Sequence, residues 1–195
     1  NYNFIFAEMN NIKIKSVLIS VFNKDGLGEL CKFFFQHKIE IFSTGGTEKY
    51  IKNLNIPVKS VESVTGYPSI LGGRVKTLHP KIFGSILSRN NSKEDQIDML
   101  KYEVPKIDMV IVDLYPFSQT VKSSDDENEI IEKIDIGGVS LIRASAKNFS
   151  DITIVSQKKQ YDYVIKYLKE NKFLSEISFR KKLAFEAFNL ISQYD

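Results

Sequence analysis

The sequence predicts an α/β fold in which a doubly wound, mainly parallel sheet is flanked by helices and followed by a C-terminal helical segment. Short apolar runs of strand length alternate along the chain with segments of helical periodicity. Residues 108–112 are continuously hydrophobic, which is typical of a parallel strand covered on both faces. Polar or glycine-rich residues follow three of the predicted strands, where sheets of this kind bind ligands.

The first half of the chain contains two units of a strand followed by a helix. The apolar run at 15–21 predicts a strand, and the helical spacing of the apolar residues at 27–37 predicts a helix. A second strand at 39–42 leads through a loop at 43–47 into a helix at 48–54. Repeated units of this type favour a parallel sheet.

The second half continues the alternation after a long insertion. The hydrophobic run at 108–112 predicts a buried strand, and the acidic run at 123–129 predicts a solvated loop and the start of a helix, where negative charge is favourable. A strand at 151–155 is followed by helices at 161–169 and 179–191. We expect residues 15–195 to form one domain, preceded by an extension or cloning remnant at 1–14.

Composition limits the classes of protein that fit. The 195 residues are 43% hydrophobic with a net charge of +3, and the basic residues are dispersed, which disfavours nucleic-acid binding and suits a small anionic ligand. Cys31 is the only cysteine and falls on an apolar helix face, so we expect a buried thiol and no disulfide. The two histidines are far apart, so we expect no metal. Without an apolar run of about 20 residues or a leader-like start, we expect a cytoplasmic protein with no membrane contact.

The segment Ser43 to Thr47 has the composition of an anion-binding loop. It combines three hydroxyl residues with Gly45 and Gly46 between a predicted strand and a predicted helix. Glycines allow a phosphate to approach the backbone, the helix N-terminus attracts negative charge, and Thr47 can cap the helix. An ordinary tight turn has a similar composition. Lys24 after the first strand is either a second phosphate contact or a surface lysine.

A second segment, from Gly72 to Pro80, is too polar and too rich in glycine for a core element. The planar guanidinium of Arg74 suits a phosphate or carbonyl oxygen. The ammonium of Lys76 could stabilise an oxyanion that develops during a reaction. His79 fits a hydrogen-bonded turn before Pro80 at least as well as a catalytic role.

Two further positions carry polar groups beside glycine or proline. Asp135 precedes Gly137 and Gly138 and is either a helix cap or a proton acceptor near lysines. Tyr115 follows the strand at 108–112 and is either a packing aromatic or a hydroxyl presented to the ligand.

Taken together, five ordered blocks resemble the inosine-monophosphate cyclohydrolase domain of the bifunctional purine biosynthesis protein. The resemblance covers about residues 15 to 195, and the matching blocks are 43–47, 73–80, 114–117, 135–138 and 143–148. It implies a methylglyoxal-synthase-like fold and a hydrolase acting on cyclic amidines. The implied reaction closes the ring of 5-formamidoimidazole-4-carboxamide ribonucleotide to inosine monophosphate with loss of water. The family's formyltransferase domain, which acts on aminoimidazole-carboxamide ribonucleotide, is expected to be absent from this chain.

The resemblance also implies roles for individual residues, with no cofactor or metal and with a homodimeric assembly. Lys76 would stabilise the oxyanion, and Tyr115, Asp135 and Lys147 would manage protons. The nucleotide would be bound by Ser20, Lys24, Ser43, Thr44, Gly45, Gly46, Thr47, Arg74, Thr77, Asp113, Leu114, Ile136, Gly137 and Gly138.

The chain departs from the family pattern at two places in the implied site. The family usually reads Ser-Val-Ser-Asp-Lys where this chain has Ser20-Val21-Phe22-Asn23-Lys24, so one hydroxyl and one carboxylate are missing. Asp113 replaces a usual asparagine, which removes an amide donor.

Three other classes of protein remain as alternatives. A methylglyoxal-synthase-type lyase or an allosteric nucleotide-binding domain of the same fold would also carry a phosphate loop, but neither explains the blocks at 74–80 and 135–138. A nucleic-acid-binding module is disfavoured by the modest charge.

Overall fold

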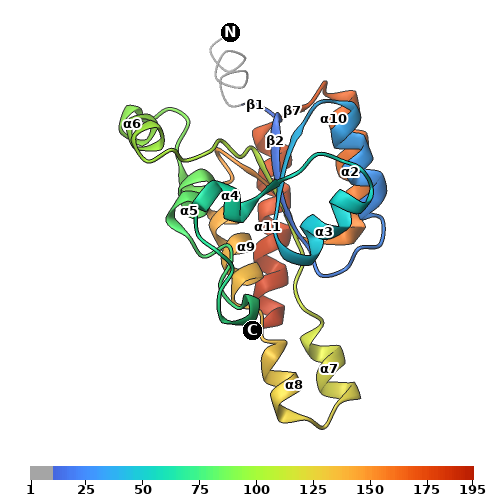
Figure 1. Cartoon of the computed structure of the whole chain (residues 1–195). Coiled ribbons are helices and arrows are strands. Elements are labelled where there is room, and N and C mark those ends of the chain that lie inside the picture. Colours follow the sequence, from blue (N-terminus) through green and yellow to red (C-terminus); the bar gives the residue numbers. More distant parts are fainter. Residues whose placement is uncertain (1–10) are drawn as a thin grey trace.

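The computed structural model describes residues 11–195, and its centre is a parallel sheet of five strands (Figure 1). The strand order is β4-β3-β2-β5-β6, and every neighbouring pair is parallel. The strands are β2 (Ser16–Ser20), β3 (Glu40–Ser43), β4 (Lys59–Ser60), β5 (Met109–Val112) and β6 (Thr153–Val155). The predicted parallel α/β fold is therefore confirmed.

The order of the strands places a topological switch point between β2 and β5. From β2 the chain winds outward through β3 and β4, then returns to the other side of β2 with β5 and β6. In doubly wound sheets the crevice beyond the carboxyl ends of the strands at such a point is the usual ligand site. Residues 20–24 and 113–115 follow the two strands that flank it.

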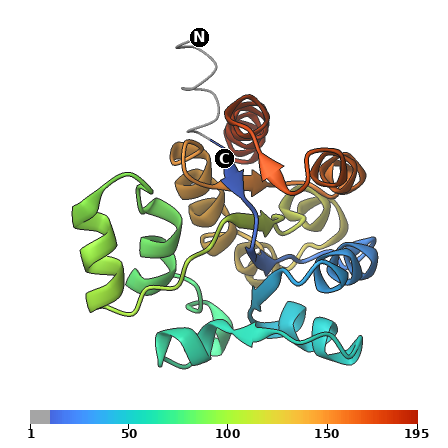
Figure 2. The same cartoon turned by 90° about the horizontal axis from the view of Figure 1, so that it is seen from above.

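Helices cover both faces of the sheet, as the view from above shows (Figure 2). One face is covered by α2 (Leu27–Gln36), α3 (Gly45–Asn53) and α10 (Tyr161–Glu170), and the other by α5 (Pro80–Leu87) and α9 (Gly137–Lys147). The long C-terminal helix α11 (Ile177–Tyr194) packs on α9 and β6. Val17, Leu18 and Ile19 of β2 are completely buried between these layers, which is why the strands are apolar along their whole length.

Several shorter elements lie outside this core. The helix α4 (Val61–Thr65) follows β4, and α6 (Lys93–Lys101) stands away from the sheet (Figure 1). A pair of short helices, α7 (Phe117–Ser123) and α8 (Glu127–Glu132), projects beyond the carboxyl ends of the strands. Two 3₁₀ turns span Leu71–Gly73 and Lys158–Gln160.

A small two-stranded sheet ties the start of the described chain to its last third. Strand β1 (Ile12–Lys13) pairs antiparallel with β7 (Leu174–Ser175), and Ile14 is buried. Residues 12–14 of the expected N-terminal extension thus fold with the domain, whereas residues 1–10 lie outside the described residues.

The guanidinium of Arg180 is completely buried beneath this small sheet. It donates hydrogen bonds to the carbonyl oxygens of Phe149 (2.8 Å), Ser150 (3.0 Å) and Ser175. Burial lowers the pKa of Arg180 to about 10. The side chain joins α11 to the turn before β6 and to β7.

The predicted elements match the structure with two kinds of difference. Helix α3 begins at Gly45, three residues earlier than predicted, because the glycines belong to its first turn instead of a loop. The helices α4, α5, α6 and α7 were not predicted, since a few turns carry too little periodicity to be recognised. Cys31 is buried, as predicted, and burial raises its pKa to about 12. Within residues 11–195, no helix is long and apolar enough to cross a membrane.

Candidate functional site

A cavity of about 350 Å³ opens at the carboxyl ends of β2, β3 and β5. It lies at the switch point of the sheet and is closed on its outer side by α8. Most of the predicted site residues line it: Ser20, Lys24, Thr44, Gly46, Thr47, Arg74, Lys76, Thr77, Asp113, Tyr115, Asp135, Ile136, Gly137 and Gly138.

The hydroxyl groups of the 43–47 segment are directed into the protein. Ser43 Oγ donates to the carbonyl of Ile19 (2.7 Å), and Thr44 Oγ1 donates to Glu62 (2.8 Å). Thr47 Oγ1 donates to the carbonyl of Val21 (2.8 Å) and accepts from its amide (3.1 Å). The expectation that Thr47 caps the helix is therefore wrong: Thr44 is the N-cap residue, and Thr47 ties the first turn of α3 to the end of β2.

These contacts leave the backbone of α3 as the part of the segment that faces the cavity. Gly45 and Gly46 are exposed in the first turn of a nine-residue helix. Backbone N–H groups in the first turn of a helix have no partner within it, and the helix dipole adds positive potential there. The segment can therefore bind an anion through main-chain amides, with its side chains serving as anchors.

Lys76 lies between two glycine backbones. A Cβ atom placed on Gly45 or on Gly73 would stand 3.5 Å from Lys76 Nζ, and both glycines have positive φ (+55° and +95°). Among the described residues, none of the ion pairs involves Lys76. Its ammonium group is thus held at the cavity without a carboxylate in contact.

Asp135 lies opposite, at the start of α9. Its Oδ1 accepts from the amide of Gly138 (2.6 Å) and its Oδ2 from the amide of Tyr115 (3.3 Å). The close approach requires glycine at 138, because a Cβ there would stand 2.5 Å from Asp135 Oδ2. Burial raises the pKa of Asp135, while these two hydrogen bonds and the charge of Lys76 oppose the rise. Asp135 therefore accepts from an amide in the first turn of α9, whose N-cap residue is Ile136, and is also a carboxylate on the cavity wall.

Tyr115 is held by aromatic contacts at the cavity edge. Its ring packs edge-on against Phe22, with 5.4 Å between centroids, and Lys133 Nζ lies over both rings at 5.8 and 5.6 Å. Burial raises the pKa of Tyr115, and the charges of Asp135 and Asp113 raise it further. Its hydroxyl is a proton donor at neutral pH.

The two departures from the family pattern contact each other. The carboxylate of Asp113 accepts from the amides of Phe22 and Asn23, the latter at 3.0 Å. Burial raises the pKa of Asp113, and the two amides and Lys24 oppose the rise. Lys24 Nζ donates to the carbonyls of Val21 (2.5 Å) and Phe22 (3.0 Å), and burial is the main cause that lowers its pKa. Asp113 therefore stabilises the loop after β2. Unlike the usual asparagine, it has no amide group that could donate to a ligand.

The helix α8 and the residues just after it supply part of the wall that sequence reasoning missed. Ile131, Glu132 and Ile134 line the cavity, and Glu132 forms an ion pair with Arg74 (3.3 Å) across its mouth. Both partners are more than half exposed. These residues lie in a segment that the sequence marked only as a helix start, with no motif to identify it.

Five predicted site residues or candidates are not part of the cavity lining, and of these Gly45 adjoins it through Lys76. Lys147 is exposed at the last residue of α9, ten residues from Gly137, which places it about 15 Å along the helix from the cavity. Ser43 is buried, and Leu114 packs on the core. His79 is the N-cap of α5, where its Nδ1 accepts from the amide of Lys81 (3.1 Å), so its structural interpretation is confirmed.

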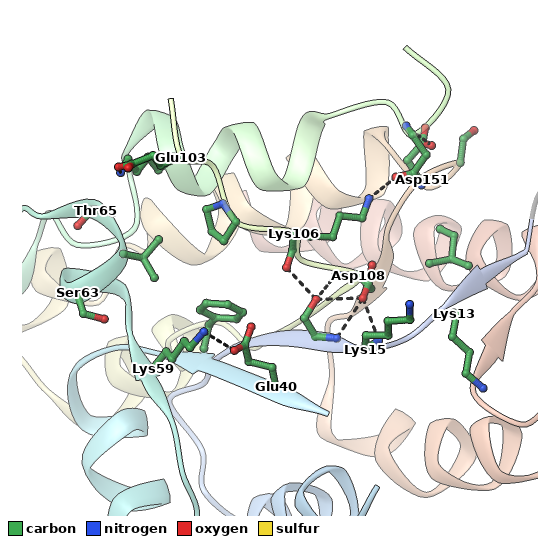
Figure 3. Close-up of a pocket in the computed structure, with 18 of the residues that line it drawn as sticks. Lys13, Lys15, Glu40, Lys59, Ser63, Thr65, Glu103, Lys106, Asp108 and Asp151 are labelled. Atoms are coloured by element: carbon green, nitrogen blue, oxygen red, sulfur yellow. Dashed lines mark hydrogen bonds and ion pairs between the residues drawn. The ribbon is translucent and has the colours of Figure 1, made fainter. Parts of the chain in front are cut away.

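A larger cavity, of about 980 Å³, lies at the opposite edge of the sheet (Figure 3). It is lined by charged residues near the amino ends of the strands, including Lys15, Lys59, Lys106, Glu40 and Asp108. Figure 3 shows Lys59 directed at Glu40 and the carboxylate of Asp108 directed at the backbone of Lys15. Across residues 11–195, no group of three or more His, Cys, Asp or Glu side chains is arranged to hold a metal ion.

Comparison with known proteins assigns both halves of the chain. Residues 26–140 match the MGS-like domain, and residues 145–195 match the AICARFT/IMPCHase bienzyme family. The chain is 52% identical over 183 residues to the bifunctional purine biosynthesis protein PurH of Bacteroides thetaiotaomicron and 47% identical over 181 residues to PurH of Clostridium perfringens. These alignments cover 94% and 93% of this chain and 36% of each relative, so the chain spans about a third of their length.

A solved structure agrees with the sequence comparisons. The crystal structure of ForH superposes with a TM-score of 0.81 at 29% identity, covering 92% of each chain. The resemblance predicted from the five sequence blocks is confirmed by these matches. With more than half of its length matched, this chain belongs to the MGS-like domain family.

Proposed function

We propose that this domain is an inosine-monophosphate cyclohydrolase, which closes the ring of 5-formamidoimidazole-4-carboxamide ribonucleotide with loss of water. The observation that carries the proposal is the placement of Lys76, Asp135 and Tyr115 around one cavity, where no carboxylate among residues 11–195 forms an ion pair with Lys76. Similarity to PurH over more than 90% of the chain supports it.

The cavity suits a ribonucleotide monophosphate. The main-chain amides of Gly45, Gly46 and Thr47 at the start of α3 receive the phosphate, and Arg74 at the mouth supplies a positive charge. Thr77, Ile136 and Gly137 line the part of the cavity next to Asp135, where the base lies. The substrate is thereby held at both ends.

Ring closure begins when the carboxamide nitrogen attacks the formyl carbon. A C–N bond forms, the formyl C=O electron pair becomes an oxyanion, and Lys76 stabilises its charge. Asp135 takes the proton from the attacking nitrogen, and Tyr115 donates a proton to the oxygen. The hydroxyl then leaves as water with the proton of the formamide nitrogen, as a C=N bond forms between that nitrogen and the former formyl carbon. Return of the Asp135 proton to Tyr115 through solvent restores the site, so substrate gives inosine monophosphate and one water.

Positioning supplies a large part of the acceleration in this scheme. A carboxamide is a poor nucleophile, so holding it against the formyl carbon is worth on the order of 7 kcal/mol or more. The reaction needs no oxidant, reductant or group carrier, and we therefore include no cofactor or metal in the proposal. The resemblance also leads us to propose a cytoplasmic location and a homodimer. Sedimentation of the purified chain tests whether it dimerises.

The deciding experiment incubates the purified chain with the formylated ribonucleotide and follows the absorbance rise of ring closure. A parallel reaction with dihydroxyacetone phosphate tests the lyase alternative, and titration with inosine monophosphate tests binding without turnover. Ring closure above the uncatalysed rate supports the proposal. Turnover of dihydroxyacetone phosphate alone, or nucleotide binding with no turnover, would reject it in favour of the corresponding alternative.

A further inference from the structure

The side chain of Tyr194 reaches from the last turn of α11 into the connection between α8 and α9. Its hydroxyl donates to the carbonyl of Lys133 (3.0 Å) and accepts from the amide of Asp135 (3.1 Å). Tyr194 does not belong to the cavity lining, and no motif in the sequence marks it. One hydroxyl thus bridges the two ends of the tripeptide that carries the candidate proton acceptor.

Both of these backbone groups need a partner from outside the helices. Lys133 is the C-cap residue of α8, so its carbonyl lies beyond the hydrogen-bond ladder of that helix. Asp135 lies between α8 and α9, so its amide belongs to neither. A phenylalanine at 194 would keep the ring and leave both groups without this hydroxyl.

The ring of Tyr194 is itself fixed against the other segment that contacts Asp135. It packs edge-on on Phe117, the first residue of α7, with 6.4 Å between centroids. The amide of Tyr115, two residues earlier, donates to the carboxylate of Asp135. Burial is the main cause that raises the pKa of Tyr194, which keeps its hydroxyl a donor. Asp135 is therefore held through its carboxylate by Tyr115 and Gly138 and through its backbone by Tyr194.

We propose that Tyr194 is a positioning residue for ring closure: it fixes the Lys133 to Asp135 backbone and thereby sets the direction of the Asp135 carboxylate. The inference rests on the proposed function. Tyr194 does not line the cavity, so it acts on the step that uses Asp135 and not on nucleotide binding. The C-terminal helix α11 is by this route a part of the site, although its residues lie outside the cavity lining.

The test compares Tyr194→Phe with Tyr163→Phe, a matched loss of one hydroxyl on α10, where the Tyr163 ring packs on Tyr167 and Phe179. Loss of a single hydrogen bond typically corresponds to a factor of about two to ten. We expect Tyr194→Phe to lower kcat about tenfold, with KM and the dissociation constant for inosine monophosphate within about twofold of wild type. Tyr163→Phe should match wild type in all three.

A double-mutant cycle separates positioning from a general loss of structure. If Tyr194 acts through Asp135, adding Tyr194→Phe to Asp135→Asn should lower the remaining turnover by less than about twofold, because coupled residues are not additive. Phe117→Leu, which keeps the hydroxyl and loosens the ring, should give a smaller loss of kcat in the same direction if Tyr194→Phe is too unstable to assay.

The outcomes are distinct from those of the proposed function. If wild type does not close the ring, the function itself is wrong. If wild type does so and Tyr194→Phe keeps full kcat, or if its tenfold loss recurs unchanged in the Asp135→Asn background, Tyr194 has no positioning role.

Discussion

Both edges of the central sheet carry lysines and carboxylates, but they hold their lysines in different ways. At the amino edge Lys59 pairs with Glu40, Lys81 pairs with Glu103 (3.5 Å), and Asp108 accepts hydrogen bonds from the backbone of Lys15 and Ser16. At the carboxyl edge Lys76 is placed by glycine backbones, without an ion pair in the described chain. The amino-edge cavity is the larger of the two, yet each carboxylate that lines it already has a partner.

The difference follows from strand polarity and teaches that cavity volume alone does not locate a site. Carboxyl ends of parallel strands lead into loops and helix N-termini, which leave backbone N–H groups free for a ligand. The amino ends receive chain from helices, and here Asp108 serves that edge as an acceptor for two amides and the hydroxyl of Ser16. We therefore expect substitutions at the carboxyl edge to change turnover and those at the amino edge to change stability.

The largest contrast should come from removing one lysine at each edge. Lys76→Ala should lower kcat/KM about 10³-fold, since a preorganised charge at an oxyanion contributes on this scale. Lys59→Ala at the amino edge should leave kcat/KM within about twofold, because exposed ion pairs contribute little. Steady-state ring closure measures kcat/KM for both variants. Near wild-type turnover of Lys76→Ala would contradict the expectation that the carboxyl edge carries the chemistry.

Asp135→Asn should lower kcat about 10²-fold through loss of the proton acceptor. In the wild type, activity should fall as the pH decreases through the pKa of Asp135, because only the carboxylate accepts a proton. Burial raises that pKa above the ordinary aspartate value of 3.8, so the acid limb of kcat/KM should lie above 3.8. Asp113→Asn is the control, because the pKa of Asp113 is also raised by burial. If the acid limb of kcat/KM disappeared in Asp113→Asn, it would report the pKa of Asp113 and not that of Asp135.

At the amino edge, Asp108→Ala should lower the free energy of unfolding by about 2–3 kcal/mol, since its buried carboxylate serves three donors. Denaturant unfolding measures the change. The folded fraction should keep the wild-type KM for the formylated ribonucleotide. A large rise in KM would mean that this edge also contacts the substrate.

Asp113→Asn should cost about 1 kcal/mol of stability, because one amide oxygen cannot accept from both the Phe22 and the Asn23 amides as two carboxylate oxygens do. Unfolding in urea checks the value. An unchanged midpoint would show that the first loop does not depend on the second oxygen.

The smallest effect should be that of Glu132→Gln at the mouth of the cavity. Its pair with Arg74 is exposed, so the free energy of unfolding should change by less than about 0.5 kcal/mol. Release of Arg74 toward the phosphate should lower KM by no more than about twofold, whereas Arg74→Ala should raise it. Steady-state ring closure at low and high salt measures KM for both variants, and unfolding in urea measures the stability of Glu132→Gln.

The sequence predicted the parts of the fold whose periodicity is strong. The apolar strands at 108–112 and 151–155 and the helix at 27–37 agree with β5, β6 and α2 to within about two residues. The start of α3 was misplaced because glycines read as loop residues even when they form the first turn of a helix. Strand β4 has only two residues, which is too short for any pattern.

The candidate site was predictable where a polar residue lies within three residues of a glycine. Lys76, Asp135 and the 43–47 segment fall in this class, and the structure brings them to one cavity. Lys147 could not be judged from sequence, since only the length and direction of α9 reveal its separation from Gly137. Ile131, Glu132 and Tyr194 were missed because their places depend on how α8 and α11 pack, which no local motif encodes.

The two glycines that enclose Lys76 also bear on the entropy of the reaction. A lysine side chain on an open surface samples many rotamers, and ordering it when a ligand arrives costs up to about 2 kcal/mol. Backbone walls at Gly45 and Gly73 remove much of that freedom during folding of the protein. An ion pair would restrict the side chain equally well, but the paired carboxylate would have to be displaced in every turnover. Steric confinement keeps the charge both ordered and available.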